Sequence, residues 1–270
     1  MLITIKEGWN MAWKQPFAVI ALFVYNLIWG LVLYKLVYSI IVPLLHRYPG
    51  ADMGREAARL FWIESQFQLS KTDLLQPYLW WAFVLLVTRM LLTPLLNAGL
   101  FFSLHHTDLN SGYRFFRGIR QLAVPFLGLY GLRMLLTLAP LWWVLPSAAG
   151  VLKTRFTYES IAADLLPILA AYLAYGYLLH LVFMYLQFSI TGGRPSWEGL
   201  LTMGRGILPA LGASILLLLV GFLLTAVVMS ASMIWAGFFA LLGYQAYRLA
   251  QMFCKVWAIS AQYRIWLAKA

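Results

Sequence analysis

The sequence predicts an all-α membrane protein, a polytopic transmembrane helical bundle of about six spans. The composition favours this fold class, because 63% of the 270 residues are hydrophobic and only 11% are charged, whereas a soluble domain has about 25% charged residues. The apolar residues also form blocks longer than the roughly 18 residues that a helix needs to cross a bilayer. These two observations exclude a water-soluble globular protein.

Six apolar blocks define the expected spans. They cover residues 17–44, 78–104, 122–145, 161–190, 207–234 and 236–267. The last two blocks almost touch, and their combined length of about 60 residues is too long for one crossing, so we expect a tight hairpin near Trp235. All six blocks belong to a single integral membrane domain over residues 1–270.

The distribution of Lys and Arg predicts the orientation. With the N-terminus inside, the inner segments hold nine basic and three acidic residues, and the outer loops hold six basic and five acidic residues. Cytoplasmic loops carry the Lys and Arg excess in membrane proteins, so we expect both termini in the cytoplasm. Residues 1–16 lack the short apolar core and cleavage site of a signal peptide and are expected to be mature cytoplasmic sequence.

Two patterns predict helices outside the spans. Residues 52–67 of the first outer loop place apolar side chains on one face, which predicts an amphipathic helix that packs on the outer mouth or closes it as a lid. Three inner segments, residues 8–16, 117–125 and 201–209, each end in a proline that suits the first turn of a span. This pattern indicates either three repeated helical hairpins with short interfacial helices, or convergent chemistry at the headgroup layer.

Charged residues at membrane depth are the main candidates for a functional site. Five cations fall inside the expected spans, namely Lys35, Arg89, Arg133, Arg248 and Lys255. A charge at the bilayer centre costs at least about 2.5 to 3.5 kcal/mol, so such residues usually face the bundle interior or a wet cavity. One interpretation is a basic cleft between spans two, three and six that binds a phosphate or a lipid headgroup. The other is five separate residues that extend to the interface or bond to polar neighbours.

Other chemistry has less support in the sequence. Asp164 and His180 are weak candidates for proton coupling, since an acid in the first turn of a helix is also an ordinary partner of the helix dipole. His105, His106 and Asp108 do not predict a metal site, because adjacent residues on a helix do not face one ligand. No nucleotide-binding, metalloprotease or hydrolase motif occurs. We therefore expect a protein that is not an enzyme, has no cofactor and binds no nucleic acid, despite its net charge of +11.

Three stretches resemble a known membrane domain. They are residues 91–106 (LLTPLLNAGLFFSLHH) with the basic segment 114–120, residues 140–167, and residues 188–200 (FSITGGRPSWEGL). Together they are similar to the multi-span domain that precedes the catalytic domain in some bacterial glycerophosphoryl diester phosphodiesterases. The resemblance implies a location in the bacterial cytoplasmic membrane. No counterpart of that family's catalytic barrel follows the last apolar block, so the resemblance implies a stand-alone membrane module without phosphodiesterase activity.

Three functions stay open on this evidence. The first is a non-enzymatic module that binds anionic lipid or phosphorylated headgroups in the basic cleft. The second is a secondary transporter, or a transporter subunit, for a small anion. The third is an assembly or scaffold factor for other membrane proteins. Membrane lipids are the expected partners in all three cases.

Overall fold

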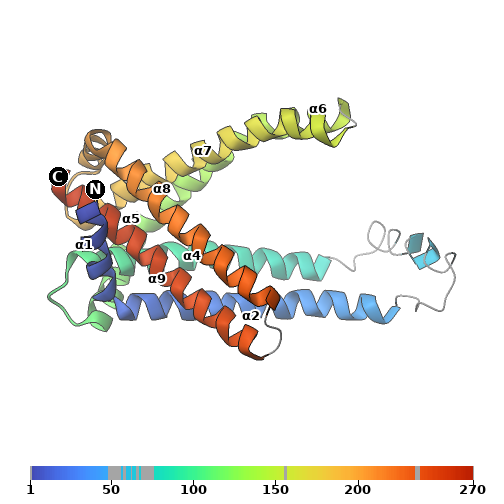
Figure 1. Ribbon diagram of the computed structural model, residues 1–270, viewed down its shortest axis with the longest axis horizontal. Helices are drawn as coiled ribbons and strands as arrows, with labels where there is room; N and C mark the ends of the chain where they lie inside the picture. The colour runs from blue at the N-terminus through green and yellow to red at the C-terminus, as the bar shows by residue number, and fades with distance from the viewer. Residues whose placement is uncertain are drawn as a thin grey trace. The chain divides into compact units, whose positions relative to one another are not determined.

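The computed structural model describes residues 2–47, 56, 59–61, 63, 64, 67, 76–154, 157–234 and 238–269. Within these ranges the regular structure is entirely helical, as Figure 1 shows. The helices are α1 (Leu2–Trp13), α2 (Pro16–Arg47), α4 (Gln76–His105), α5 (Ser111–Leu138), α6 (Leu141–Thr154), α7 (Tyr158–Thr191), α8 (Ser196–Ile234) and α9 (Phe238–Lys269).

Five helical stretches are long and apolar enough to cross a membrane. They are Pro16–Val42, Gln76–His105, Ser111–Thr154, Tyr158–Thr191 and Trp197–Ala231. The predicted fold class is confirmed at this level, and by helix composition the chain is a multi-pass membrane protein. The expected sixth span at 236–267 corresponds to α9, which is not among the five.

The expected third span, residues 122–145, is not one straight helix. α5 ends at Leu138 and α6 begins at Leu141, because Pro140 has no N–H to donate to the carbonyl of Leu136. The hydroxyl of Tyr175 on α7 donates to that carbonyl instead, at 2.9 Å. A tyrosine from the next helix therefore satisfies the backbone group that the proline leaves without its usual donor.

Two of the three expected interfacial helices are not separate elements. Only the first segment forms its own helix, α1, whereas α5 and α8 continue unbroken through Pro125 and Pro209. A proline removes one backbone hydrogen bond, and a helix can continue past it where the freed carbonyl is solvated. The predicted outer helix at 52–67 lies largely outside the described residues, and residues 235–237 of the predicted hairpin near Trp235 lie outside them too.

The chain divides into two compact units, residues 21–93 and residues 1–20 with 94–270. In the first unit α2 and α4 form an antiparallel hairpin. The hydroxyl groups of Tyr25 and Thr93 are hydrogen-bonded at 3.0 Å, and near the other end of the hairpin the Tyr78 hydroxyl lies 3.5 Å from the Ser39 carbonyl. Such hydrogen bonds between helices satisfy polar groups that have no water to bond to inside a membrane.

The second unit contains two more hairpins. α5 and α7 are joined by the Tyr175 bond described above. α8 and α9 are joined near both ends: the hydroxyl groups of Thr225 and Tyr247 lie 2.8 Å apart, and Gln262 Nε2 donates to the Ala210 carbonyl at 2.8 Å. These two contacts fix α9 antiparallel to α8 over most of its length.

The buried core of the second unit occupies one end of its helices. Buried residues lie within 98–104 of α4, 114–126 of α5, 181–191 of α7, 199–217 of α8 and 256–266 of α9, together with one face of α1. Beyond Phe126, Leu181, Leu217 and Val256, the described parts of α5 to α9 contain no buried residue. Long apolar stretches with exposed side chains suit contact with lipid. We call the packed part the α1 end of this unit.

Small residues bring the helices close together at the α1 end. A Cβ at Gly8 of α1 would lie 2.6 Å from the Ala261 Cα of α9, and one at Gly199 of α8 would lie 2.8 Å from the Tyr185 carbonyl oxygen of α7. Such close approaches are typical of membrane helix interfaces, where small residues let backbones touch. The two termini of the chain therefore belong to the same packed end.

Candidate functional site

Three of the predicted site residues lie at similar levels near the point where the packed core of the second unit ends. Arg133 lies on α5, His180 on α7 and Lys255 on α9. His180 precedes the buried Leu181, and Lys255 precedes the buried Val256. We call Arg133, His180 and Lys255 the basic cluster.

The pairing of α5 with α7 explains the first half of this cluster. Tyr175 of α7 bonds to Leu136 of α5, and the two helices are antiparallel. Moving one turn back along α5 reaches Arg133, while moving just over one turn forward along α7 reaches His180. The two side chains therefore share one level of the hairpin.

The contact of α7 with α9 explains the second half. The hydroxyl of Tyr185 on α7 donates to Gln262 Oε1 on α9 at 3.1 Å, and these two helices run in the same direction. Lys255 lies seven residues before Gln262, and His180 lies five residues before Tyr185. The two residues thus differ in level by about 3 Å.

The other predicted residues of the second unit lie elsewhere. Arg248 is half-buried, its Nε donates to the Tyr244 hydroxyl at 3.0 Å, and its guanidinium lies 5.0 Å from that ring. Seven residues, or about 10.5 Å of helix, separate Arg248 from Lys255. Asp164 is half-buried on α7, sixteen residues or about 24 Å from His180. The predicted proton-coupling residues Asp164 and His180 therefore do not contact each other.

Two predicted residues belong to the unit of residues 21–93. Lys35 on α2 and Arg89 on α4 are both exposed, and the Arg89 guanidinium lies 5.9 Å from the ring centre of Trp29. A cation over an indole face is attracted by the ring quadrupole. The predicted cleft that includes Arg89 beside Arg133 and Arg248 stays a prediction.

A buried polar cluster that the sequence did not predict lies at the α1 end. Arg114, only 3% exposed, donates hydrogen bonds to the Lys14 carbonyl at 2.6 Å, to Gln15 Oε1 at 2.9 Å and to the Thr107 carbonyl at 3.2 Å. Gln15 Nε2 in turn donates to the Ser103 carbonyl at 2.9 Å. We call Gln15, Ser103 and Arg114 the Arg114 cluster. It joins the end of α1, the end of α4 and the start of α5 with one guanidinium.

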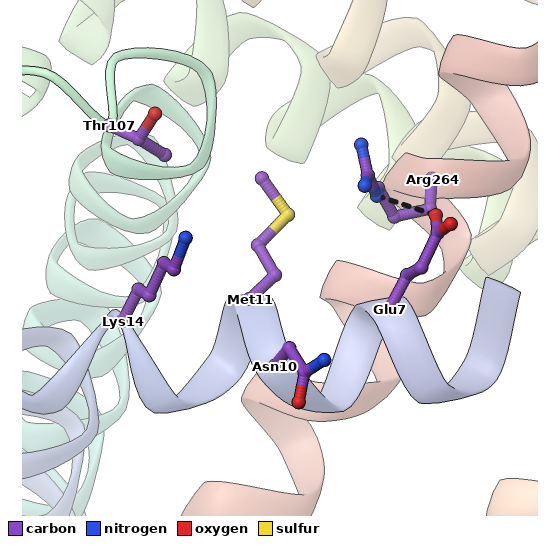
Figure 2. Close-up of a pocket in the computed structure, with 6 residues that line it drawn as sticks. All are labelled: Glu7, Asn10, Met11, Lys14, Thr107 and Arg264. Carbon is purple, nitrogen blue, oxygen red and sulfur yellow. Dashed lines mark ion pairs between the residues drawn. The ribbon is translucent and has the colours of Figure 1, made fainter. Parts of the chain in front are cut away.

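The Arg114 cluster fixes two sides of an open groove, drawn in Figure 2. The groove has a volume of about 330 Å³ and is lined by Glu7, Asn10, Met11, Lys14, Thr107 and Arg264. Three of these residues come from α1, Lys14 follows α1 directly, and the other two come from the loop after α4 and from α9. We call this feature the α1 groove. Its volume is at the lower end of the range for small-molecule sites.

Three contacts hold the third side of the α1 groove in place. Glu7 Oε2 pairs with Arg264 Nε at 3.0 Å, the dashed contact in Figure 2, and Trp257 Nε1 donates to the Ile5 carbonyl at 3.0 Å. His105, at the end of α4, lies 2.7 Å from the Tyr263 hydroxyl. The groove therefore has α1, the α4–α5 loop and α9 as walls, and each wall is bonded to another.

Comparison with known proteins assigns the chain to no family. No family model, curated protein or solved structure matches the chain. The resemblance to the phosphodiesterase membrane domain stays a prediction.

Proposed function

We propose that the chain is a non-enzymatic membrane module that binds the phosphate of an anionic lipid headgroup at the basic cluster. The observation that supports this function is that Arg133, His180 and Lys255, from three helices, lie at similar levels, as the bonds of Tyr175 to Leu136 and of Tyr185 to Gln262 set them. Bringing two cations together in a medium of low dielectric is unfavourable unless an anion lies between them. A phosphate oxygen can accept from both side chains and from the imidazole.

The depth of the cluster fits a lipid of the inner leaflet. Arg133 lies eight residues beyond Pro125, about 12 Å along the helix, and the sequence places this proline near the headgroup layer. Long basic side chains can extend several ångströms toward that layer while their stems stay in apolar surroundings. Beyond the cluster, the described parts of α5 to α9 contain no buried residue, so the acyl chains of a lipid bound at the cluster can lie against these helices.

We infer six crossings with both termini in the cytoplasm. α9 is antiparallel to α8 from Tyr247 to Gln262, so a membrane crossed by α8 is crossed again by α9. The ion pair of Glu7 with Arg264 supports an even number of crossings, because it joins α1 to the last helix. The Lys and Arg excess of the inner loops then assigns this end to the cytoplasm.

Retention of anionic phospholipid by the purified protein tests the function. We expect native mass spectrometry to show about tenfold weaker retention for Arg133→Gln and for Lys255→Gln, the loss that one charge-assisted hydrogen bond accounts for. Arg248→Gln should have a smaller effect, since Tyr244 already binds that guanidinium.

The matched control is Lys153→Gln, which removes an exposed cation at the last turn of α6. The control variant should retain anionic lipid like the wild type. Equal retention by the wild type, Arg133→Gln, Lys255→Gln and the double variant would refute the proposal.

A further inference from the structure

The α1 groove lies apart from the basic cluster and has different electrostatics. It combines two cations, Lys14 and Arg264, with one carboxylate, Glu7. We propose that the groove binds a zwitterionic aminophosphate, the chemistry of an ethanolamine phosphate headgroup, with the phosphate at Lys14 and the amine at Glu7. This inference goes beyond the function proposed for the basic cluster and does not depend on it.

The spacing of the groove residues on α1 supports this ligand class. Glu7 and Met11 lie four residues apart and share one face of α1, and Lys14 follows directly after α1, where its N–H donates to the Met11 carbonyl at 3.1 Å. Figure 2 shows these three side chains rising from α1 on the same side. The carboxylate and the ammonium thus mark the two ends of the groove, with a thioether between them.

The separation of the groove's charged residues suits a short ligand. Glu7 and Lys14 lie seven residues apart, so their backbones are on the order of 10 Å apart. A phosphate and an amine joined by two carbons form a ligand short enough to bind both side chains at once, and Met11, which also lines the groove, offers an apolar contact for the two methylene groups.

The polar groups around both ends fit the same ligand. Thr107 lines the groove from the α4–α5 loop, and its hydroxyl can donate to a phosphate oxygen. Glu7 pairs with Arg264 through Oε2, and a carboxylate can accept at both of its oxygens. An ammonium group with N–H donors can therefore bind Glu7 without breaking the ion pair.

The groove is also positioned for a headgroup. Lys14 lies two residues before Pro16. Arg264 lies two residues beyond Gln262, and Gln262 bonds to the carbonyl of Ala210, the residue after Pro209. Both cations are thus near the prolines that the sequence places at the headgroup layer. The ligand can come from a lipid of the inner leaflet or from a soluble aminophosphate.

Calorimetric titration of the full chain in detergent tests the ligand chemistry. We expect O-phosphoethanolamine to bind more tightly than inorganic phosphate and than phosphocholine, whose quaternary ammonium has no N–H for Glu7. Lys14→Gln should weaken phosphoethanolamine binding about tenfold, and Glu7→Gln should abolish the preference over phosphocholine. Lys6→Gln and Glu159→Gln, at exposed positions away from the groove, are the matched controls and should bind like the wild type.

A second arm separates the two sources of the ligand. If the source is a lipid, native mass spectrometry in nanodiscs should show that the wild type retains phosphatidylethanolamine over phosphatidylcholine and that Glu7→Gln does not. Binding of soluble phosphoethanolamine without this lipid preference identifies a soluble source. Wild-type protein that binds phosphoethanolamine no better than inorganic phosphate, with no lipid preference in nanodiscs, overturns the proposal. The Arg133→Gln, Lys255→Gln double variant should leave phosphoethanolamine binding unchanged, so the two sites can fail separately.

Discussion

Replacing Arg114 by methionine should destabilise the α1 end more than any other single change of a cation in this unit. Methionine fills much of the same space but donates no hydrogen bond. The bond to the Thr107 carbonyl matters least, because Thr107 is exposed and water can replace the donor. The bonds to the Lys14 carbonyl and to Gln15 Oε1 are lost without replacement.

The magnitude follows from those two bonds. Hydrogen bonds from a charged donor contribute about 1.5 to 3 kcal/mol each, so their loss costs about 3 to 6 kcal/mol. Part of this loss is offset, because the buried guanidinium of Arg114 no longer has to be kept out of water. We therefore expect a net loss of about 3 kcal/mol, which corresponds to a fall of about 6 to 12 °C in Tm for a chain of this size.

Tryptophan fluorescence during a thermal ramp in detergent measures this effect. Arg117→Met is the matched control, since Arg117 is exposed on the next turn of α5 and its replacement should change the free energy of unfolding by less than about 0.5 kcal/mol. Arg114→Lys should lie between the two, because one ammonium cannot reach all three acceptors of a guanidinium fork. If Arg114→Met and Arg117→Met unfold at the same temperature, the Arg114 cluster does not hold the three helices together.

Two further predictions concern the packing of α1 and the topology. Gly8→Leu should displace α1 from α9, because the α9 backbone leaves no room for a side chain at this position. Proteolysis of the N-terminal segment should therefore be faster in this variant. Gly204→Leu is the control, since no neighbouring atom lies within 4 Å of that position, and it should not change the rate of proteolysis. In a Cys254→Ala background, cysteine at Lys153 should react with an impermeant maleimide outside intact cells, whereas cysteine at Lys269 should react only after the membrane is opened. Labelling of Lys269→Cys from outside would contradict an even number of crossings.

The sequence was sufficient to locate most helices. Apolar block length alone predicted the second span, 78–104, against the observed Gln76–His105, and the fourth, 161–190, against Tyr158–Thr191. Block length works because a bilayer requires a minimum run of apolar residues, and this requirement is local in the chain. The same rule cannot predict how far a helix continues beyond its apolar block. For this reason it did not predict that α8 begins eleven residues before its expected span.

The candidate sites were predictable only in part, because they depend on contacts between distant residues. The charges of the basic cluster could be recognised as costly at membrane depth, but their similar level in the structure follows from the pairing of α5 with α7 and of α7 with α9, which the sequence does not show. Gln15 and Arg114 are separated by 99 residues, and each looked like an ordinary polar residue of an inner segment. A polar residue directly before a span proline, as at Gln15, is the one local signal that could have indicated a buried capping group.

α9 shows how polar residues can keep a helix from being recognised as a span by its hydropathy. Arg248 and Lys255 lower its mean hydropathy, yet hydropathy assigns the full cost of lipid exposure to every side chain. In the hairpin, Tyr247 and Gln262 bond to α8, and Arg248 bonds to Tyr244 of its own helix. Each of these polar groups has a partner within the protein, so the cost of moving the helix into the membrane is lower than its composition indicates. A membrane helix that carried the proposed binding site would have to contain such residues, and its composition alone would then be a poor guide to whether it crosses the membrane.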